Sequence, residues 1–506
     1  MKKNLLLSLF SLLLMGTTTA QTKFNSMNDQ NLVAYEVPEW YQDAKIGYWA
    51  IWGLYSVPAF GSEWYGRFMY CNDENDPGQA KGMKVAKSHR EKFGDPATFE
   101  YEDFIPLFKA EKFNADEWLD LTVAGGAKFF TMIGIFHDNY CMWDSKSNPY
   151  NTVNTGPHRD IVAELKEATK ERGLKFGLSN HSAWNATFFQ YRHKNGYAKN
   201  DTPEDRHKYG TGSVDQEAIE RWWAQTLEMA NKYQPDLYYF DWGWNQNPLF
   251  DQRRKDFLAY YYNEALKWNN ATYPSPEVVV NYKKVEKLPY GSAVLDLERG
   301  GMSEIKDEVW QNDTSIGKIS WSYVPNEKFK SANHIVDMLM DIISKNGILM
   351  LAFGPNGDGS IPAVAKESLT AIGDWLKVNG EAVYATRPWS LYGEGVTVPK
   401  QGMGGDEVDY VAEDIRFTRS KDNSTLYITF LGYPEGGEGV VKNLKKSNID
   451  LSTLKSIELL GSNAKIKVSQ KDDGLHIKLP KAVDKDSYAY SLKLKFENSI
   501  PQLKTK

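Results

Sequence analysis

The chain has 506 residues, too many for one ordinary hydrophobic core, so we expect a large domain with at least one further domain attached. Hydrophobic residues make up 41% of the sequence, which is enough to fill such a core. The formal net charge is −6, and acidic and basic residues are interspersed without a basic stripe, so we expect no nucleic-acid partner.

Residues 1–20 have the pattern of a secretory signal peptide. Two lysines follow Met1, an apolar run extends from Leu5 to Met15, and small residues lead to Ala20, after which we expect cleavage. The run is shorter than the roughly 20 residues that span a bilayer, and no other stretch approaches that length. We therefore expect a secreted or periplasmic protein without membrane insertion.

Apolar strand-like runs alternate with amphipathic helical segments over residues 21–385. Such alternation implies parallel strand pairing, and eight units close into a (β/α)8 barrel. A doubly wound open sheet is the alternative, but Gly53-Leu54-Tyr55-Ser56 after the first strand is no dinucleotide-binding loop. The predicted strands are 46–52, 127–134, 174–179, 237–241, 278–282, 293–298, 319–323 and 348–353. The predicted helices are 115–123, 160–172, 216–233, 254–268, 332–344 and 363–378.

Residues 386–506 show short alternating segments separated by Gly, Asn and Asp turns, which predicts a C-terminal antiparallel β-sandwich. Its expected role is structural support, with sugar binding as the alternative. The predicted strands are 414–418, 425–430, 457–460, 475–479 and 488–496.

The chain has only two cysteines, Cys71 and Cys141. One disulfide and two buried thiols are both compatible with this spacing, and neither residue belongs to a zinc-binding pattern. The histidines are not part of an HExxH motif or of a closely spaced acidic set, so the sequence predicts no metal site.

Asp241 ends the apolar run 237–240 and precedes Trp242-Gly243-Trp244. In a βα barrel the reacting groups project from the carboxyl ends of the strands, and aromatic rings pack on the apolar face of a sugar. Asp241 is therefore the first candidate catalytic residue. The alternative is an aspartate that caps the following helix.

Hydrolysis of a glycosidic bond usually takes two carboxylates. Glu298 lies where the sixth predicted strand meets a glycine-rich loop, whereas Glu304 and Glu308 lie in a polar stretch that we expect to face solvent. Glu298 is thus the better second candidate. A strand-end glutamate could equally serve as the partner of a nearby Arg or Lys.

Further polar and aromatic residues follow the first three predicted strands, as Asp241 follows the fourth. They are Glu63 and Trp64 after the first strand, His137 after the second, and Asn180 and His181 after the third. Each is weak evidence alone, since a lone histidine is more often a core or surface residue than a ligand. Together they predict a site at one rim of the barrel for a polyhydroxylated ligand.

A series of short motifs runs in order along residues 40–389. It comprises the stretches 43–45, 52–59, 62–65, 137–138, 143–145, 156–160, 173–178, 310–311, 314–316, 354–355, 357–359 and 379–382. On these motifs the chain resembles the α-L-fucosidases of glycoside hydrolase family 29. The series covers most of the mature chain and is highly specific.

The resemblance implies a barrel with a C-terminal β-sandwich, no metal or other cofactor, and a retaining double displacement. It implies that Asp241 is the nucleophile, and Glu298 fits best as the acid/base residue although the loop that carries it varies in length. The family's sugar contacts match Glu63, Trp64 and His137.

Several positions depart from the family pattern. Ile51 and Phe136 replace two histidines, Ser179 replaces an aromatic residue beside Asn180 and His181, Tyr239 replaces a tryptophan, and Lys283 replaces an arginine. The last change loses bidentate bonding. We therefore expect Ser179, Asn180, His181, Tyr239 and Lys283 to line a rebuilt sugar pocket.

These changes lead to a hypothesis about the substrate. A wall of Ser, Asn and His could bond the extra hydroxyl of α-L-galactose, or a sulfate on it, so this sugar competes with α-L-fucose. We predict a secreted retaining exo-α-L-glycosidase acting on oligosaccharides or polysaccharides, with its two carboxyl groups about 5 to 5.5 Å apart. The alternative is a non-catalytic glycan-binding relative. The sequence makes no prediction of oligomeric state.

Overall fold

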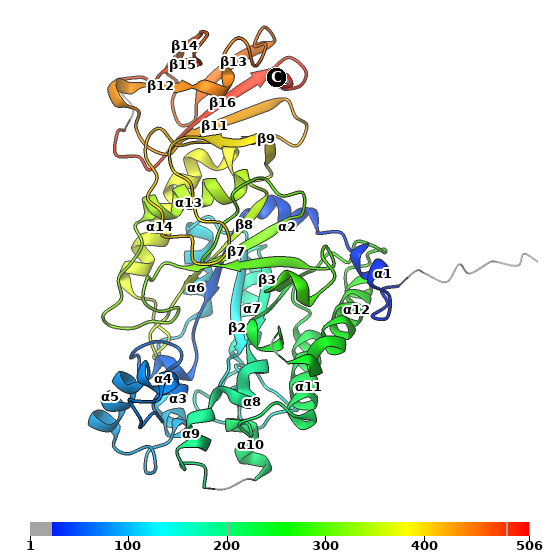
Figure 1. The fold of residues 1–506 in the computed structure, drawn as a ribbon, viewed down its shortest axis with the longest axis vertical. Helices are drawn as coiled ribbons and strands as arrows, with labels where there is room; N and C mark the ends of the chain where they lie inside the picture. Colours follow the sequence, from blue (N-terminus) through cyan, green and yellow to red (C-terminus); the bar gives the residue numbers. More distant parts are fainter. Residues whose placement is uncertain (1–22, 200–201, 246, 482–483, 505–506) are drawn as a thin grey trace, which may run out of the picture.

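The computed structural model describes residues 23–199, 202–245, 247–481 and 484–504, and its centre is a closed barrel of eight parallel strands, β1 to β8 (Figure 1). Each strand pairs with its neighbours in chain order, and β8 closes the barrel by pairing with β1, where Leu349 lies opposite Ile46. The (β/α)8 prediction is confirmed, and an open doubly wound sheet is excluded.

Seven of the eight barrel strands lie within two residues of their predicted bounds. The seventh prediction, 319–323, is wrong, because β7 comes earlier and those residues form a loop. The strands are β1 Ile46–Ala50, β2 Phe129–Ile135, β3 Lys175–Asn180, β4 Leu237–Phe240, β5 Val279–Tyr282, β6 Val294–Glu298, β7 Trp310–Ser315 and β8 Gly347–Phe353.

The strand β7 is polar in sequence and yet fully buried. Gln311 accepts a hydrogen bond from the Tyr41 hydroxyl at 2.6 Å and donates one to Asp296 at 2.7 Å, and Asn312 donates to the carbonyl oxygen of Gly300 at 2.5 Å. Buried polar groups are tolerated when they are bonded in this way. A search for apolar runs therefore missed this strand.

Helices surround the barrel, and the six predicted ones all form. The Asp215 side chain caps α11 by accepting from the backbone N–H of Ala218. These six helices are α6 Ala115–Ala124, α7 Ile161–Glu171, α11 Gln216–Tyr233, α12 Asp251–Trp268, α13 Ala332–Ser344 and α14 Ala363–Asn379. Two short helices, α1 Asp29–Val33 and α2 Glu39–Ala44, precede β1.

Short helices after β1 and β3 lie at the end of the barrel opposite the sandwich (Figure 1). They belong to the long loops that follow these strands, and so they lie beside the carboxyl end of the barrel. They are α3 Tyr65–Phe68, α4 Pro77–Ala80, α5 Met83–Phe93, α8 Asn185–Phe188, α9 Gln190–Lys194 and α10 Pro203–Tyr209.

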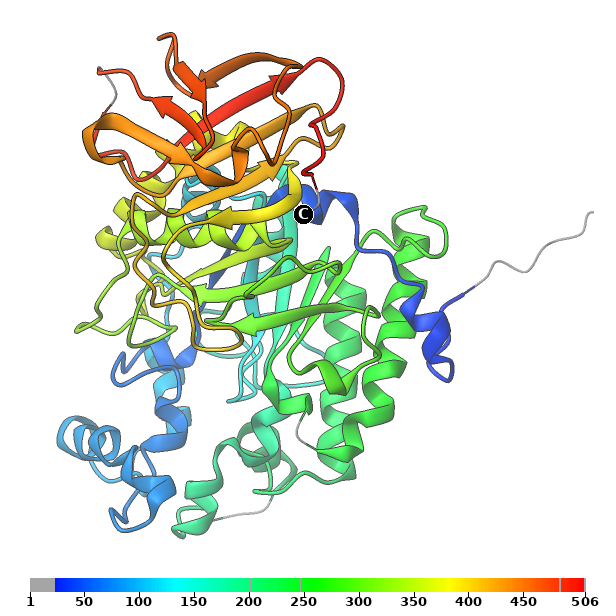
Figure 2. The same ribbon diagram turned by 45° about the horizontal axis from the view of Figure 1, so that its top comes forward.

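The C-terminal region forms two antiparallel sheets, one of five strands in the order β13-β16-β11-β10-β9 and one of three in the order β12-β15-β14 (Figure 2). The predicted sandwich is confirmed, although β9, β12 and β14 were not predicted. The boundary at 385/386 remains a prediction. The strands are β9 Arg387–Glu394, β10 Ile415–Arg419, β11 Thr425–Phe430, β12 Glu438–Val441, β13 Leu454–Leu459, β14 Lys467–Gln470, β15 Leu475–Lys478 and β16 Tyr490–Phe496.

A buried group of charges joins the sandwich to the barrel. Asp341 on α13 accepts from Arg416 on β10 at 2.7 Å and from Lys345 at 2.7 Å, and all three side chains are at most 5% exposed. The Arg416 guanidinium also lies over the ring of Tyr410, 5.1 Å from its centroid. The two domains therefore share a bonded polar core, in which Arg416 of the sandwich takes its carboxylate from the barrel.

Cys71 and Cys141 are both buried free thiols, so the structure favours that alternative over a disulfide. The predicted signal peptide, residues 1–20, lies outside the described residues. Within the described part of the chain, no helix has the length and apolar character needed to cross a membrane.

Candidate active site

A cavity of about 440 Å³, counted with its open mouth, lies at the carboxyl ends of the barrel strands. Trp49 and Tyr239, both buried in barrel strands, line its inner part, and Trp64 and Trp321 come from the loops around its mouth. The cavity therefore combines a closed inner end with aromatic walls, which suits one sugar ring.

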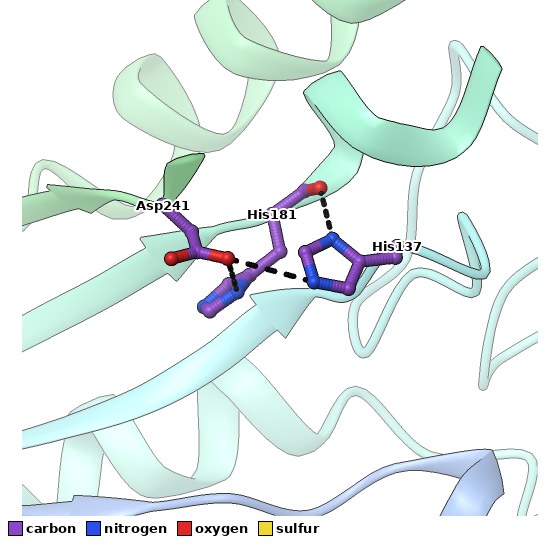
Figure 3. Close-up of side chains that lie close together, drawn as sticks. All are labelled: His137, His181 and Asp241. Carbon is purple, nitrogen blue, oxygen red and sulfur yellow. Dashed lines mark hydrogen bonds and ion pairs between the residues drawn. The ribbon is translucent and has the colours of Figure 1, made fainter. Parts of the chain in front are cut away.

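Asp241 follows the last residue of β4 and faces two histidines from neighbouring strand ends (Figure 3). Its Oδ2 atom lies 3.5 Å from Nε2 of His137 and 3.3 Å from Nδ1 of His181. Its Oδ1 atom lies 3.6 Å from Nζ of Lys283. Asp241 thus contacts groups from three other strand ends in a side chain that is only 13% exposed.

The surroundings of Asp241 favour its ionised form. Burial alone raises the pKa of this carboxyl, but the neighbouring His181 ring and the Lys283 ammonium outweigh burial and hold the pKa well below its usual value. Asp241 is therefore a carboxylate at any ordinary pH, which is the state a nucleophile needs.

His137 is neutral and has a defined tautomer. Burial lowers the pKa of His137 to about 3, although Asp241 opposes this shift. Its Nδ1 atom lies 2.8 Å from the carbonyl oxygen of His181, which can only accept, so Nδ1 carries the proton (Figure 3). The Nε2 atom therefore presents a lone pair to the cavity that can accept from a sugar hydroxyl.

Glu298, the last residue of β6, lies in the same cavity. Its Oε2 atom accepts from the indole N–H of Trp242 at 2.6 Å and from Lys283 Nζ at 2.6 Å, and its side chain is 26% exposed. One carboxyl group is thus fixed by two donors while remaining accessible from the mouth. Glu304 and Glu308 are exposed, as expected.

Lys283 is the common centre of the cavity's charges. Besides Asp241 and Glu298, its Nζ atom lies 3.2 Å from Asp313 and 3.7 Å from Asp296, in a side chain only 2% exposed. Burial alone lowers the pKa of Lys283, but the surrounding carboxylates outweigh it and hold the pKa well above its usual value. Burial and the charge of Asp313 raise the pKa of Asp296 far above its usual value, so Asp296 retains its proton.

Glu63 reaches the cavity from the loop after β1. Its Oε2 atom accepts from the Ser320 hydroxyl at 3.1 Å and from the backbone N–H of Trp321 at 3.2 Å. Burial raises the pKa of Glu63 above its usual value, against the effect of these donors. Glu63 thereby joins the β1 loop to the loop after β7 at the wall of the cavity.

Eight of the ten predicted site residues line the cavity: Glu63, Trp64, His137, His181, Tyr239, Asp241, Lys283 and Glu298. Ser179 and Asn180 do not. Asn180 bonds Thr226 on α11 at 3.0 Å, outside the barrel. The Ser179 hydroxyl lies within the barrel, 3.3 Å from both the His181 ring and the Trp49 indole nitrogen. The expected polar wall of Ser179 and Asn180 is therefore absent, and His181 alone reaches the cavity.

The structure adds residues that sequence reasoning did not assign to the site: Trp49, Ile133, Trp242, Asp313 and Trp321, with Ile51 and Phe136 at the positions of the two lost histidines. Asp313 lies two residues after Gln311 on β7 and so on the same face of the strand. A period of two in a polar strand could have identified it. Ile51, Ile133 and Phe136 make part of the wall apolar.

His137, His181 and Asp241 are also the described side chains that could hold a metal ion, since their donor atoms lie within 4.8 Å of one another (Figure 3). Two imidazoles and a carboxylate are ligands that Zn²⁺ and Cu²⁺ accept. An ion bound here would occupy the carboxylate of Asp241. Because catalysis would need that carboxylate free, an ion bound here fits an inhibitor better than a catalytic cofactor.

Comparison with family models gives two matches along the chain. The model described as "Alpha-L-fucosidase" matches residues 11–381, and the model described as "Alpha-L-fucosidase C-terminal domain" matches residues 408–495. The first match spans the barrel and the second most of the sandwich.

Individual proteins and solved structures agree with this result. The chain is 31% identical to the tissue alpha-L-fucosidase of Rattus norvegicus over 453 residues, which are 88% of this chain and 86% of that protein. It is 29% identical to the plasma alpha-L-fucosidase of Homo sapiens over 461 residues, 89% and 87% of the two chains. The crystal structure of Thermotoga maritima alpha-fucosidase superposes with a TM-score of 0.73 at 28% identity, covering 93% of this chain and all of that one.

Proposed function

The chain belongs to the alpha-L-fucosidase family of glycoside hydrolases, and we propose that it removes terminal α-L-fucose from glycans with retention of configuration. In this proposal Asp241 attacks the anomeric carbon while Glu298 protonates the departing oxygen. Glu298 then acts as a base on a water molecule, which releases the sugar from Asp241.

The shared ammonium of Lys283 is the observation that carries the retaining mechanism. Its Nζ atom lies 3.6 Å from Asp241 and 2.6 Å from Glu298, so the two oxygens can be no farther apart than the sum of these distances. This limit on one pair of oxygens is compatible with the roughly 5 to 5.5 Å between the carboxyl groups of retaining enzymes.

The stereochemistry of the first product tests this mechanism. Proton NMR of freshly hydrolysed 4-nitrophenyl α-L-fucoside should show the α anomer of the sugar before mutarotation. If the β anomer forms first, Asp241 is not a nucleophile and the proposal fails.

Cleavage of terminal sugars is supported by the closed inner end of the cavity, where Trp49 and Tyr239 are at most 2% exposed. The scissile bond must then face the mouth, where the partly exposed Glu298 lies. A released monosaccharide should be the product of any active oligosaccharide. Internal cleavage, seen as larger fragments by chromatography, would contradict this part of the proposal.

Fucose is favoured over α-L-galactose by the composition of the wall. Ile51, Ile133 and Phe136 offer no hydrogen bond to an additional hydroxyl, and Ser179 and Asn180 do not line the cavity. A hydroxymethyl group buried without a partner loses free energy, whereas a methyl group gains it. The Thermotoga maritima alpha-fucosidase, which has been solved in complex with fucose, matches this chain over 93% of its length.

Paired aryl α-L-fucoside and α-L-galactoside substrates test the choice of sugar. We expect kcat/KM to be higher for the fucoside by about ten- to a hundredfold, the range that one buried group commonly gives. A preference for the galactoside, or for a 6-sulfated form, would overturn the choice of sugar and leave the retaining mechanism in place.

A non-catalytic glycan-binding role is the alternative. The presence of both carboxylates on one lysine argues against it, because binding alone requires neither. Calorimetry that detects tight binding of a fucosylated glycan without release of fucose would favour this alternative. Export remains a separate proposal based on residues 1–20, and N-terminal sequencing of extracellular protein should begin at Gln21.

A further inference from the structure

We propose that a loop of the C-terminal region, residues 396–411, positions Glu298 for its work as acid and base. This loop, called the strap below, connects β9 to β10 and runs from the sandwich toward the barrel (Figure 2). The inference rests on the proposed role of Glu298.

The side chain of Asp414 holds the two ends of the strap together through hydrogen bonds. Asp414 accepts from the backbone N–H groups of Val396 and Thr397, both at 2.9 Å, through Oδ1. Its Oδ2 atom accepts from the Thr397 hydroxyl at 2.6 Å and from the backbone N–H of Val411 at 2.9 Å. Four bonds to one buried carboxylate close the neck of the loop, so its far end has a limited range of positions.

The far end of the strap pairs with the backbone that follows β6. Gly402 and Gly301 exchange two backbone hydrogen bonds, of 2.8 and 3.0 Å. The N–H of Gly404 donates to the carbonyl oxygen of Glu298 itself at 3.2 Å, and the N–H of Gly405 donates to that of Arg299 at 2.7 Å. The strap therefore acts as an additional strand on the turn that carries the candidate acid.

The backbone conformation of this turn is unfavourable by itself. Arg299 has a φ of +45°, in the left-handed region that residues other than glycine rarely adopt. Its N–H is bonded to the carbonyl oxygen of Asp313 at 2.8 Å, and its own carbonyl oxygen accepts from both Gly405 and Asp406 of the strap. Such a conformation persists only when its surroundings fix it, and the strap supplies two of these three bonds.

Asp406 anchors the strap to the barrel. Its Oδ2 atom lies 3.1 Å from Nζ of Lys330 and accepts from the Thr314 hydroxyl of β7, and its side chain is only 3% exposed. The backbone carbonyl oxygen of Asp406 lies 2.7 Å from the His334 ring on α13. Asp406 is therefore also the carboxylate partner of a buried lysine, Lys330.

The strap should affect one chemical step more than the others. A small displacement of Glu298 weakens proton transfer to the departing oxygen, which matters for a poor leaving group and little for an activated one. A general loss of structure would lower both rates equally. Asp406 is thus a positioning residue whose effect depends on the substrate.

The test compares kcat/KM for 2,4-dinitrophenyl α-L-fucoside and for a fucosylated disaccharide. Asp406→Asn removes the anchor's charge, and Thr314→Val removes its barrel-side hydroxyl. We expect each variant to lose about tenfold on the disaccharide and less than about twofold on the activated fucoside. Glu413→Gln is the matched control, the same loss of one carboxylate at an exposed side chain beside the neck of the strap, and should alter neither rate.

Glu298→Gln separates the two possible failures. This variant should lose far more on the disaccharide than on the activated fucoside. If it does, and the Asp406 and Thr314 variants lower both rates equally or change neither, the strap does not position the acid. If Glu298→Gln itself gives no difference between the substrates, Glu298 is not the acid and the proposed function fails. Circular dichroism of each variant checks that it is folded.

Discussion

The indole of Trp242 should hold Glu298 in place for proton transfer to the departing oxygen. Its N–H donates to Glu298 Oε2 at 2.6 Å, and Lys283 Nζ donates to the same oxygen at 2.6 Å. Hydrogen bonds to charged groups contribute about 1.5 to 3 kcal/mol, which corresponds to a change in rate of roughly ten- to 150-fold. Because Trp242 is half-buried and water can replace part of the bond, we expect the lower value, about tenfold.

The perturbation is Trp242→Phe, and the assay compares kcat/KM for a fucosylated disaccharide and for 2,4-dinitrophenyl α-L-fucoside. Loss of the donor releases one of the two bonds that fix the Glu298 carboxyl group, so the acid is less well placed beside the departing oxygen. The rate on the disaccharide should therefore fall by about tenfold, while the activated fucoside, whose leaving group needs little help from an acid, should lose less than about twofold.

Trp244→Phe is the matched control. Trp244 is buried and stacks on Phe240 with ring centroids 3.8 Å apart, and its indole N–H has no acceptor among the described residues. Its replacement should alter neither rate. An unchanged rate on the disaccharide in Trp242→Phe, an equal loss on both substrates, or the same result in both variants would refute the reasoning.

Three further outcomes follow from the structure. Asp241→Asn should lower kcat by about 10⁴-fold or more while thermal unfolding remains cooperative; turnover near the wild-type rate would remove its role as nucleophile. Asp341→Asn leaves Lys345 and Arg416 buried without their carboxylate and should cost about 3 to 5 kcal/mol in chemical denaturation, whereas a loss below about 1 kcal/mol would contradict a buried network. Zn²⁺ should inhibit competitively with substrate through the histidines beside Asp241, and treatment with a chelator should leave activity intact; activity lost with the chelator would contradict metal-independent chemistry.

The barrel could be predicted from the sequence wherever a strand was apolar, and the prediction failed where burial was polar. The strand β7 has the sequence Trp310-Gln311-Asn312-Asp313-Thr314-Ser315, whose side chains bond groups on other elements, such as Tyr41 on α2 and Asp296 on β6. Those partners are far apart in the chain, so hydrophobicity favoured 319–323 instead. The family motifs at 310–311 and 314–316 lie on the true strand or directly after it. The hydrophobic pattern alone did not identify this strand.

The rim residues were predictable because strand ends gather at one end of a barrel. It was harder to predict which side chains point into the cavity, since neighbours along a strand face opposite sides. Asn180 faces the helix α11, while His181, one residue later, faces Asp241. The grouping of Asp296, Asp313 and Glu298 around Lys283 depends on the curvature of the closed sheet, which no local pattern encodes.

The ammonium of Lys283 leaves the inner end of the cavity with a surplus of negative charge, since the carboxylates of Asp241 and Asp313 both lie beside it. Such a field acts as an electrostatic filter. A sugar analogue with a protonated ring nitrogen gains attraction there, while a sulfate directed inward is repelled. A negatively charged group on a bound sugar is therefore tolerated only where it points outward, toward the mouth of the cavity.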